Sequence, residues 1–167
     1  MRMMPILEQG DPSEVFGDAS LRLFVKLLLK DGAVFGSKLT CELLRVVIIL
    51  LERMEEQIID YRKDLLKYIW GILKADNSNT KYIGYLAVSK FVAAFETPPK
   101  VILQVYRSLL RSHSSVEKEN VRAAMGVLLP TLPARLGEQD LEIALKYTVK
   151  VMHEEGDSLP QTAHLWE

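Results

Sequence analysis

The sequence predicts an all-α fold, a solenoid of stacked antiparallel helix pairs. Apolar residues recur at helical spacing along most of the 167-residue chain. No segment alternates apolar and polar residues between tight hairpin turns, so strand signals are absent. The helical segments themselves recur about every 40 residues, a period typical of HEAT and armadillo repeats. Together these observations predict a HEAT/armadillo-like α-solenoid of about four repeats.

The first half of the chain contains three clear helical segments. LRLFVKLLLK, at 21–30, is followed by Asp31-Gly32, which is a suitable C-terminal stop. Ser37 is predicted to cap the next helix, which runs to about Met54 and is apolar nearly all round. Such a helix must be covered on several sides. A third helix is expected at about 60–74, before the turn residues DNSN.

The second half continues in the same way. A helix is expected from about 79 to Phe95, and Thr97-Pro98-Pro99 ends it and starts the next. The following helix carries a regular apolar stripe at 101, 102, 105, 106, 109 and 110. Ser114 and Glu117 have the spacing of a capping box after the loop 111–115. The last helix, at 138–155, is expected to stop at Gly156.

The starting points of these helices define the repeat. First helices are predicted to begin near 37, 79 and 116, and their partners near 61, 99 and 138. Since one pair cannot bury its apolar face alone, neighbouring pairs must stack into one continuous core. We expect a single solenoid segment over 1–167, with helix pairs at about 1–32, 37–75, 79–112 and 115–155, and with 157–167 starting a further helix. Neither end has the polar character of a capping repeat, which predicts a piece of a longer array.

The stretch VRAAMGVLLPTLPARLG, at 121–137, has prolines at 130 and 133 within a helical pattern. A proline in a helix removes one backbone hydrogen bond, and it disfavours helical geometry at the preceding residue. We therefore expect the helix to kink or end near Leu129. Leu132 is expected to remain packed on the core, in a short turn that leads to Gly137.

Composition excludes several classes of function. The 21 basic and 22 acidic side chains nearly balance, so the electrostatic drive for direct nucleic-acid binding is missing. The longest apolar run, at 46–51, is far shorter than the roughly 20 residues that span a bilayer. The single cysteine, Cys41, cannot form an internal disulfide and is expected to be buried. These features predict a soluble, intracellular chain without a membrane partner.

No combination of side chains predicts catalysis, a metal site or a cofactor. His153-Glu154 begins like a zinc-protease helix, but Asp157 stands where the second histidine should be. The segment that starts at Asp76 lacks the glycine and the final glutamate of a calcium loop. Ser112 and His113 are adjacent in a loop, with no carboxylate placed to orient the imidazole. The sequence predicts no catalytic residue, no cofactor and no small-molecule substrate.

One set of residues is a candidate protein-interaction surface. Basic residues gather in the third quarter of the chain: Lys100, Arg107, Arg111, Arg122 and Arg135. A solvated helix face is the default interpretation of such a set. The sharper hypothesis is that Lys100, Arg107, Arg111 and Arg122 contact an acidic peptide. The aromatic residues fall at helical spacings, and core packing explains most of them: Tyr68, Trp70, Tyr82, Tyr85, Phe91, Phe95 and Tyr106.

Three segments carry a resemblance to a known family. They are PPKVILQVYRSLLRSH, VRAAMGVLLPTLPARL and KVMHEEGDSLPQ, which occur in order between 98 and 161. From about Lys81 onward the chain resembles the middle helical-repeat region of the transformation/transcription domain-associated protein (TRRAP-like) family. The first 80 residues fit helical repeats but carry fewer such marks.

The resemblance implies a non-catalytic role. Members of this family are giant, almost wholly helical relatives of the phosphatidylinositol-3-kinase-like kinases, and their kinase domain lacks the catalytic residues. They are scaffolds in nuclear histone acetyltransferase coactivator complexes and docking surfaces for transcriptional activators. The resemblance therefore implies protein partners of these two kinds, a nuclear location and no catalytic residue in this segment. Two alternatives stay open: a HEAT-repeat scaffold of nuclear transport or phosphatase regulation, and a small all-helical enzyme.

Overall fold

The computed structural model describes residues 10–31, 35–75, 78–112 and 118–154, and every long element in them is a helix. The N-terminal part comprises α2 (Pro12–Val15), α3 (Asp18–Asp31), α4 (Ser37–Arg53), α5 (Glu55–Ile58), the short 3-10 turn η1 (Ile59–Tyr61) and α6 (Arg62–Lys74). The C-terminal part comprises α7 (Ser78–Ala94), α8 (Pro99–Leu110), α9 (Lys118–Arg135) and α10 (Glu138–Glu154). The described residues contain no strand, so the predicted all-α class is confirmed.

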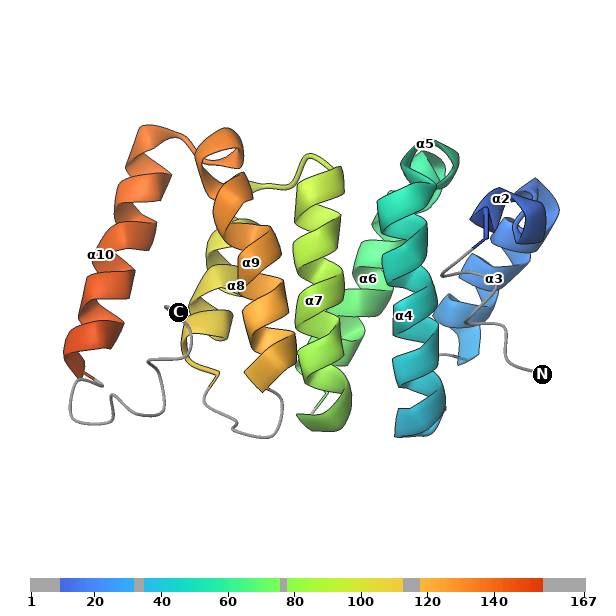
Figure 1. Cartoon of the computed structure of the whole chain (residues 1–167), viewed down its shortest axis with the longest axis horizontal. Helices are drawn as coiled ribbons and strands as arrows, with labels where there is room; N and C mark the ends of the chain where they lie inside the picture. Colours follow the sequence, from blue (N-terminus) through green and yellow to red (C-terminus); the bar gives the residue numbers. More distant parts are fainter. Residues whose placement is uncertain (1–9, 32–34, 76–77, 113–117, 155–167) are drawn as a thin grey trace.

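The helices form two layers, as an α-solenoid requires. Figure 1 shows α4, α7 and α9 side by side in the front layer, and α6 and α8 lie behind them. α7 packs most extensively against α9 and α4, and it also contacts α6 and α8. α3 packs against α6 at one end, and α10 packs against α8 at the other. The predicted HEAT/armadillo-like architecture is confirmed.

The core runs continuously between the layers. α4, predicted to need cover on several sides, buries seven of its residues, including Leu44, Val47 and Leu50. α7 contributes Val88, Phe91 and other buried side chains. Most of the aromatic residues expected in the core are buried, namely Tyr68, Tyr85, Phe91, Phe95 and Tyr106, whereas Trp70 and Tyr82 are partly buried.

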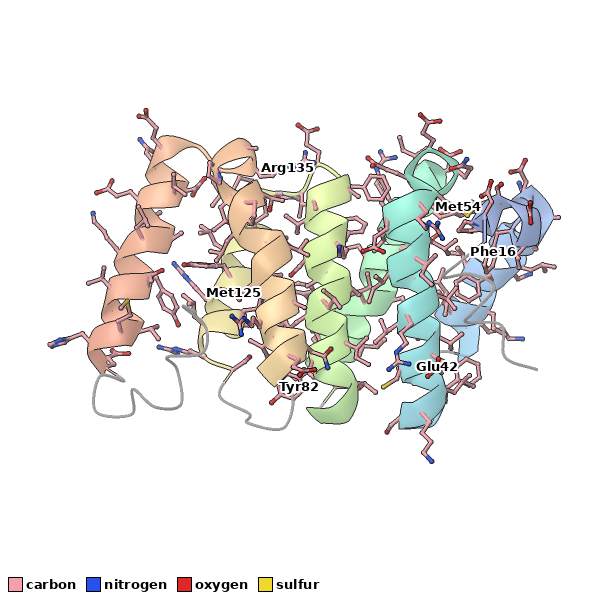
Figure 2. All side chains as sticks on the ribbon, in the orientation of Figure 1. Phe16, Glu42, Met54, Tyr82, Met125 and Arg135 are labelled. Carbon is pink, nitrogen blue, oxygen red and sulfur yellow. The ribbon has the colours of Figure 1, made fainter. Side chains whose placement is uncertain are left out.

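Two polar links join helices that are distant in sequence. The Lys90 ammonium of α7 lies 2.6 Å from a carboxylate oxygen of Glu52 on α4. At the end of α9, Arg135 donates a hydrogen bond of 2.8 Å to the backbone carbonyl of Ala93 on α7 (Figure 2). Both links connect members of the front layer, so they support the side-by-side packing of α4, α7 and α9.

The helix was expected to kink or end near Leu129, and it does not end there. α9 continues through Pro130 and Pro133 to Arg135. Both prolines are exposed, so their rings face solvent, while Leu132 is buried as expected. Leu132 shares one face with Leu128, and packing of this face against α7 outweighs the lost backbone hydrogen bonds.

Two smaller predictions are also corrected. α4 has Gly36 at its N-cap and Ser37 as its first helical residue, so Ser37 does not occupy the cap position. Cys41 is only partly buried, although Thr40 just before it in α4 is buried. The predicted stops at Gly32 and Gly156, the capping box of Ser114 and Glu117, the loop residue His113 and the segments at 76–77 and 157–167 lie outside the described residues.

Candidate protein-interaction groove

An open groove of about 970 Å³ lies between α7, α8 and α10 and is here called the basic groove. Its charged lining among the described residues comprises four basic side chains and one acidic one, Asp140. The described residues that line it are Lys81, Tyr82, Tyr85, Lys100, Leu103, Gln104, Arg107, Ser108, Arg111, Ser112, Asp140 and Tyr147. An excess of positive charge in a concave surface attracts anionic ligands.

One face of α8 supplies the polar stripe of the groove. Lys100, Gln104, Arg107 and Arg111 are spaced by four, three and four residues, which places them along one side of the helix. The opposite face of α8 is buried through Ile102, Val105, Tyr106 and Leu109, among others. Burial of the apolar face therefore fixes the orientation of the basic one.

α10 closes the groove through contacts with α8. The guanidinium carbons of Arg107 and Arg111 lie 5.1 and 5.4 Å from the centre of the Tyr147 ring. Such cation–π contacts hold both guanidinium groups against one ring. Beneath them the hydroxyl of Tyr106 lies 2.6 Å from that of Thr148, and this buried hydrogen bond joins the two helices.

The structure brings together three of the four predicted surface residues. Lys100, Arg107 and Arg111 line the basic groove. Arg122 is exposed on α9 and does not line it. Sequence reasoning missed Lys81 and Tyr147, because they belong to α7 and α10 and only the packing of these helices brings them to α8. Tyr82, labelled in Figure 2 at the lower end of α7, was predicted to serve mainly the core but also reaches the groove.

A second pocket, of about 340 Å³, lies among α3, α4 and α6 and has a more apolar lining. The hydroxyl of Tyr68 lies in it, buried and without a hydrogen-bond partner among the described residues. Burial, with a smaller contribution from Cys41, raises the pKa of Tyr68 to about 12. A phenol of that pKa is neutral at physiological pH, so this pocket carries no charge from Tyr68.

The described residues contain no group of three histidine, cysteine or acidic side chains close enough to hold a metal ion. Within the same residues, no helix combines the length and the apolar character that a membrane crossing requires.

A two-layered array of antiparallel helix pairs with an open charged groove defines this chain as an α-helical repeat protein of the HEAT class. The chain belongs to the family described as the Tra1 HEAT repeat ring region, whose model matches residues 9–167. The family resemblance predicted from the sequence is thereby confirmed, and it extends well before Lys81.

Three relatives illustrate the relationship. The probable transcription-associated protein 1 of Dictyostelium discoideum is 33% identical over 80% of this chain. The human transformation/transcription domain-associated protein is 32% identical over 74% of the chain. The SAGA complex/NuA4 acetyltransferase complex subunit TRA1 of Saccharomyces cerevisiae is 34% identical over 57% of the chain. This chain spans 3%, 3% and 2% of the lengths of these proteins, respectively. No solved structure gives a significant match.

Proposed function

We propose that this chain is a non-catalytic scaffold segment of a nuclear transcription coactivator subunit of histone acetyltransferase complexes. The observation that carries the proposal is the family match over residues 9–167, together with two yeast relatives that are named as subunits of the SAGA and NuA4 acetyltransferase complexes. The continuous two-layered array supports it, because stacked repeats offer extended surfaces to several proteins at once.

We propose complex subunits and transcriptional activators as the partners, with no direct role for nucleic acid, a membrane or a small-molecule substrate. The whole chain would act as one solenoid segment, built from the helix pairs 1–32, 37–75, 79–112 and 115–155. The near balance of charge supports protein partners over nucleic acid.

The test is to purify, through an affinity tag, the full-length protein that contains this segment from nuclear extract. We expect acetyltransferase activity on nucleosomal histones to co-purify, and crosslinks to join exposed lysines such as Lys63 and Lys146 to other subunits. Nuclear exclusion of the protein, or its recovery without acetyltransferase activity and without such crosslinks, would refute the proposal.

Within this segment we propose the basic residues Lys100, Arg107, Arg111 and Arg122 as the protein-interaction surface. Acidic activation segments often dock as short amphipathic helices in grooves of helical proteins. The expected result is weaker binding of acidic activator peptides after reversal of charge at Arg107, Arg111 and Arg122 together. Unchanged binding of these peptides would remove the surface from the proposal.

A further inference from the structure

Two arginines of the basic groove share one aromatic ring. Arg107 lies in the last turn of α8 and Arg111 is its C-cap residue, and the Tyr147 ring of α10 lies 5.1 and 5.4 Å from their guanidinium carbons. Both arginines are exposed, so their N–H donors are accessible to an anion from solvent. The ring of Tyr147 therefore contacts two guanidinium groups at the surface of the groove.

The charges around this pair favour a dianion over a single carboxylate. A carboxylate has two oxygens, which one guanidinium fork already satisfies. A phosphate monoester carries nearly two negative charges and three terminal oxygens, so it can accept hydrogen bonds from two guanidinium groups together. Lys81 and Lys100 add positive charge to the same groove, and Asp140 is the one acidic residue in its lining.

Glu154 is the residue that competes for this site. One of its carboxylate oxygens lies 3.8 Å from Arg111, and the other lies 3.5 Å from Lys150. Both are long ion pairs between half-exposed side chains, which contribute little free energy. A phosphate, with its larger charge, would displace Glu154 from Arg111.

The length of the polar stripe of α8 determines how many residues of a bound peptide it can contact. From Lys100 to Arg111 the helix rises by roughly 16 Å, at about 1.5 Å per residue. An extended peptide covers this distance with about five residues, at roughly 3.3 Å each. The groove is open, so a chain can pass through it, and its cations are few compared with those of a surface that follows a nucleic-acid backbone.

We propose that the basic groove binds a phosphorylated serine or threonine in an acidic segment of a partner protein. Arg107 and Arg111 hold the phosphate, and Lys100 meets an acidic residue about five positions away along the segment. This inference rests on the proposed scaffold function, and it adds that docking at this groove depends on phosphorylation of the partner.

The experiment measures binding of this chain by fluorescence anisotropy. The probe is a labelled degenerate peptide pool with a central phosphoserine and aspartates about five positions away on either side. Matched pools carry serine or glutamate at the centre, and inositol hexakisphosphate and single-stranded RNA serve as further probes. The variants are Arg107→Gln with Arg111→Gln, both arginines replaced by lysine, Glu154→Gln, and Arg45→Gln on α4 as an exposed arginine control outside the groove. Thermal unfolding of each variant, followed by circular dichroism, establishes that it is folded.

We expect the phosphoserine pool to bind best, and the double glutamine variant to lose about ten-fold or more in affinity. The double lysine variant keeps both positive charges but loses the paired N–H donors of the guanidinium groups. Its affinity should therefore fall less than that of the double glutamine variant. Arg45→Gln should leave the affinity unchanged. Glu154→Gln should raise the affinity about two- to five-fold by removing the competing carboxylate. A purely structural role of the arginines would produce no such gain.

Three results would overturn the inference. Equal binding of the glutamate pool would show a site for carboxylates, which leaves the scaffold function intact. Binding of inositol hexakisphosphate or RNA without binding of the phosphopeptide would assign the groove to another ligand class. Absence of binding by every probe would remove the site altogether. The scaffold function is tested separately, by the purification of the full-length protein.

Discussion

Replacement of Thr148 by valine should destabilise the chain more than replacement of Tyr106 by phenylalanine, although both changes remove the same hydrogen bond. The two hydroxyls lie 2.6 Å apart between α8 and α10, and their residues are only 3% and 8% exposed. Thr148 also donates to the backbone carbonyl of Ala144, at 3.0 Å. Because a threonine hydroxyl has a single proton, Thr148 must be the acceptor in its bond with Tyr106.

The asymmetry follows from this assignment. In Tyr106→Phe the threonine keeps its bond to Ala144, so the loss is that of an ordinary hydrogen bond, about 0.5–1.5 kcal/mol. In Thr148→Val the phenol remains buried without an acceptor, which costs about 1–3 kcal/mol. The double variant leaves no unpaired hydroxyl, and it should therefore be less destabilised than Thr148→Val alone.

Urea unfolding followed by circular dichroism at 222 nm (the helical band) measures all three free energies, provided that the slope with urea stays constant. The wild-type chain and the three variants form a double-mutant cycle. Equal losses in the two single variants, or a double variant whose loss equals their sum, would refute the reasoning.

Four further substitutions test the helix backbone and the second pocket. Pro130→Ala should raise the free energy of unfolding by about 1–3 kcal/mol, because it restores a helical hydrogen bond at an exposed position; an unchanged urea midpoint would contradict this. Gly126→Ala should stabilise the chain by about 0.5–1 kcal/mol, since its new methyl group meets nothing within 4 Å. Gly84→Ala should gain less, because its methyl group would lie 3.1 Å from Leu73, and a larger gain than at Gly126 would disprove the steric argument. Tyr68→Phe should stabilise the chain by about 1 kcal/mol near neutral pH, as it removes a buried hydroxyl without a partner among the described residues. The pKa of Tyr68 is about 12 in the fold against 10.0 ordinarily, so below pH 10 the phenol is neutral in both states and its effect on stability is constant. Between pH 10 and about 12 the phenol ionises in the unfolded chain before it ionises in the fold, so the wild-type chain loses stability. The stability difference between wild type and Tyr68→Phe, measured by urea unfolding across this range, should therefore widen, and a constant difference would contradict the burial of the phenol.

The fold could be predicted from the sequence because each helix carries its own apolar stripe. The proline-containing helix shows the limit of local rules. Pro130 and Pro133 each favour a kink or an end in α9, and the prediction that it kinks or ends near Leu129 followed from them. Instead α9 continues past both prolines, and Leu132 within this part of the helix is buried. Its burial is a tertiary effect, which a local sequence pattern cannot predict.

The same distinction applies to the groove. Lys100, Arg107 and Arg111 could be selected from the sequence, because they follow one face of a single helix. Tyr147 could not, since its place beside the arginines depends on how α10 packs on α8. Arg122 is close to them in sequence, yet it belongs to α9 and lies outside the groove. In a helical repeat, residues that are close in sequence thus often share a helix, but they do not necessarily share a site.

The central position of α7 has a consequence for how the chain opens. In a repeat array each unit is stabilised by its immediate neighbours, and α7 contacts four other helices, α4, α6, α8 and α9. Its backbone amides should exchange with solvent deuterium only when the whole array unfolds. α10 buries only Ala144, Thr148 and Val151, so its amides should exchange through local openings that leave α7 intact. The basic groove therefore lies between α7, which opens only on global unfolding, and α10, which opens locally. A ligand that contacts both α8 and α10 should slow amide exchange in α10 in particular.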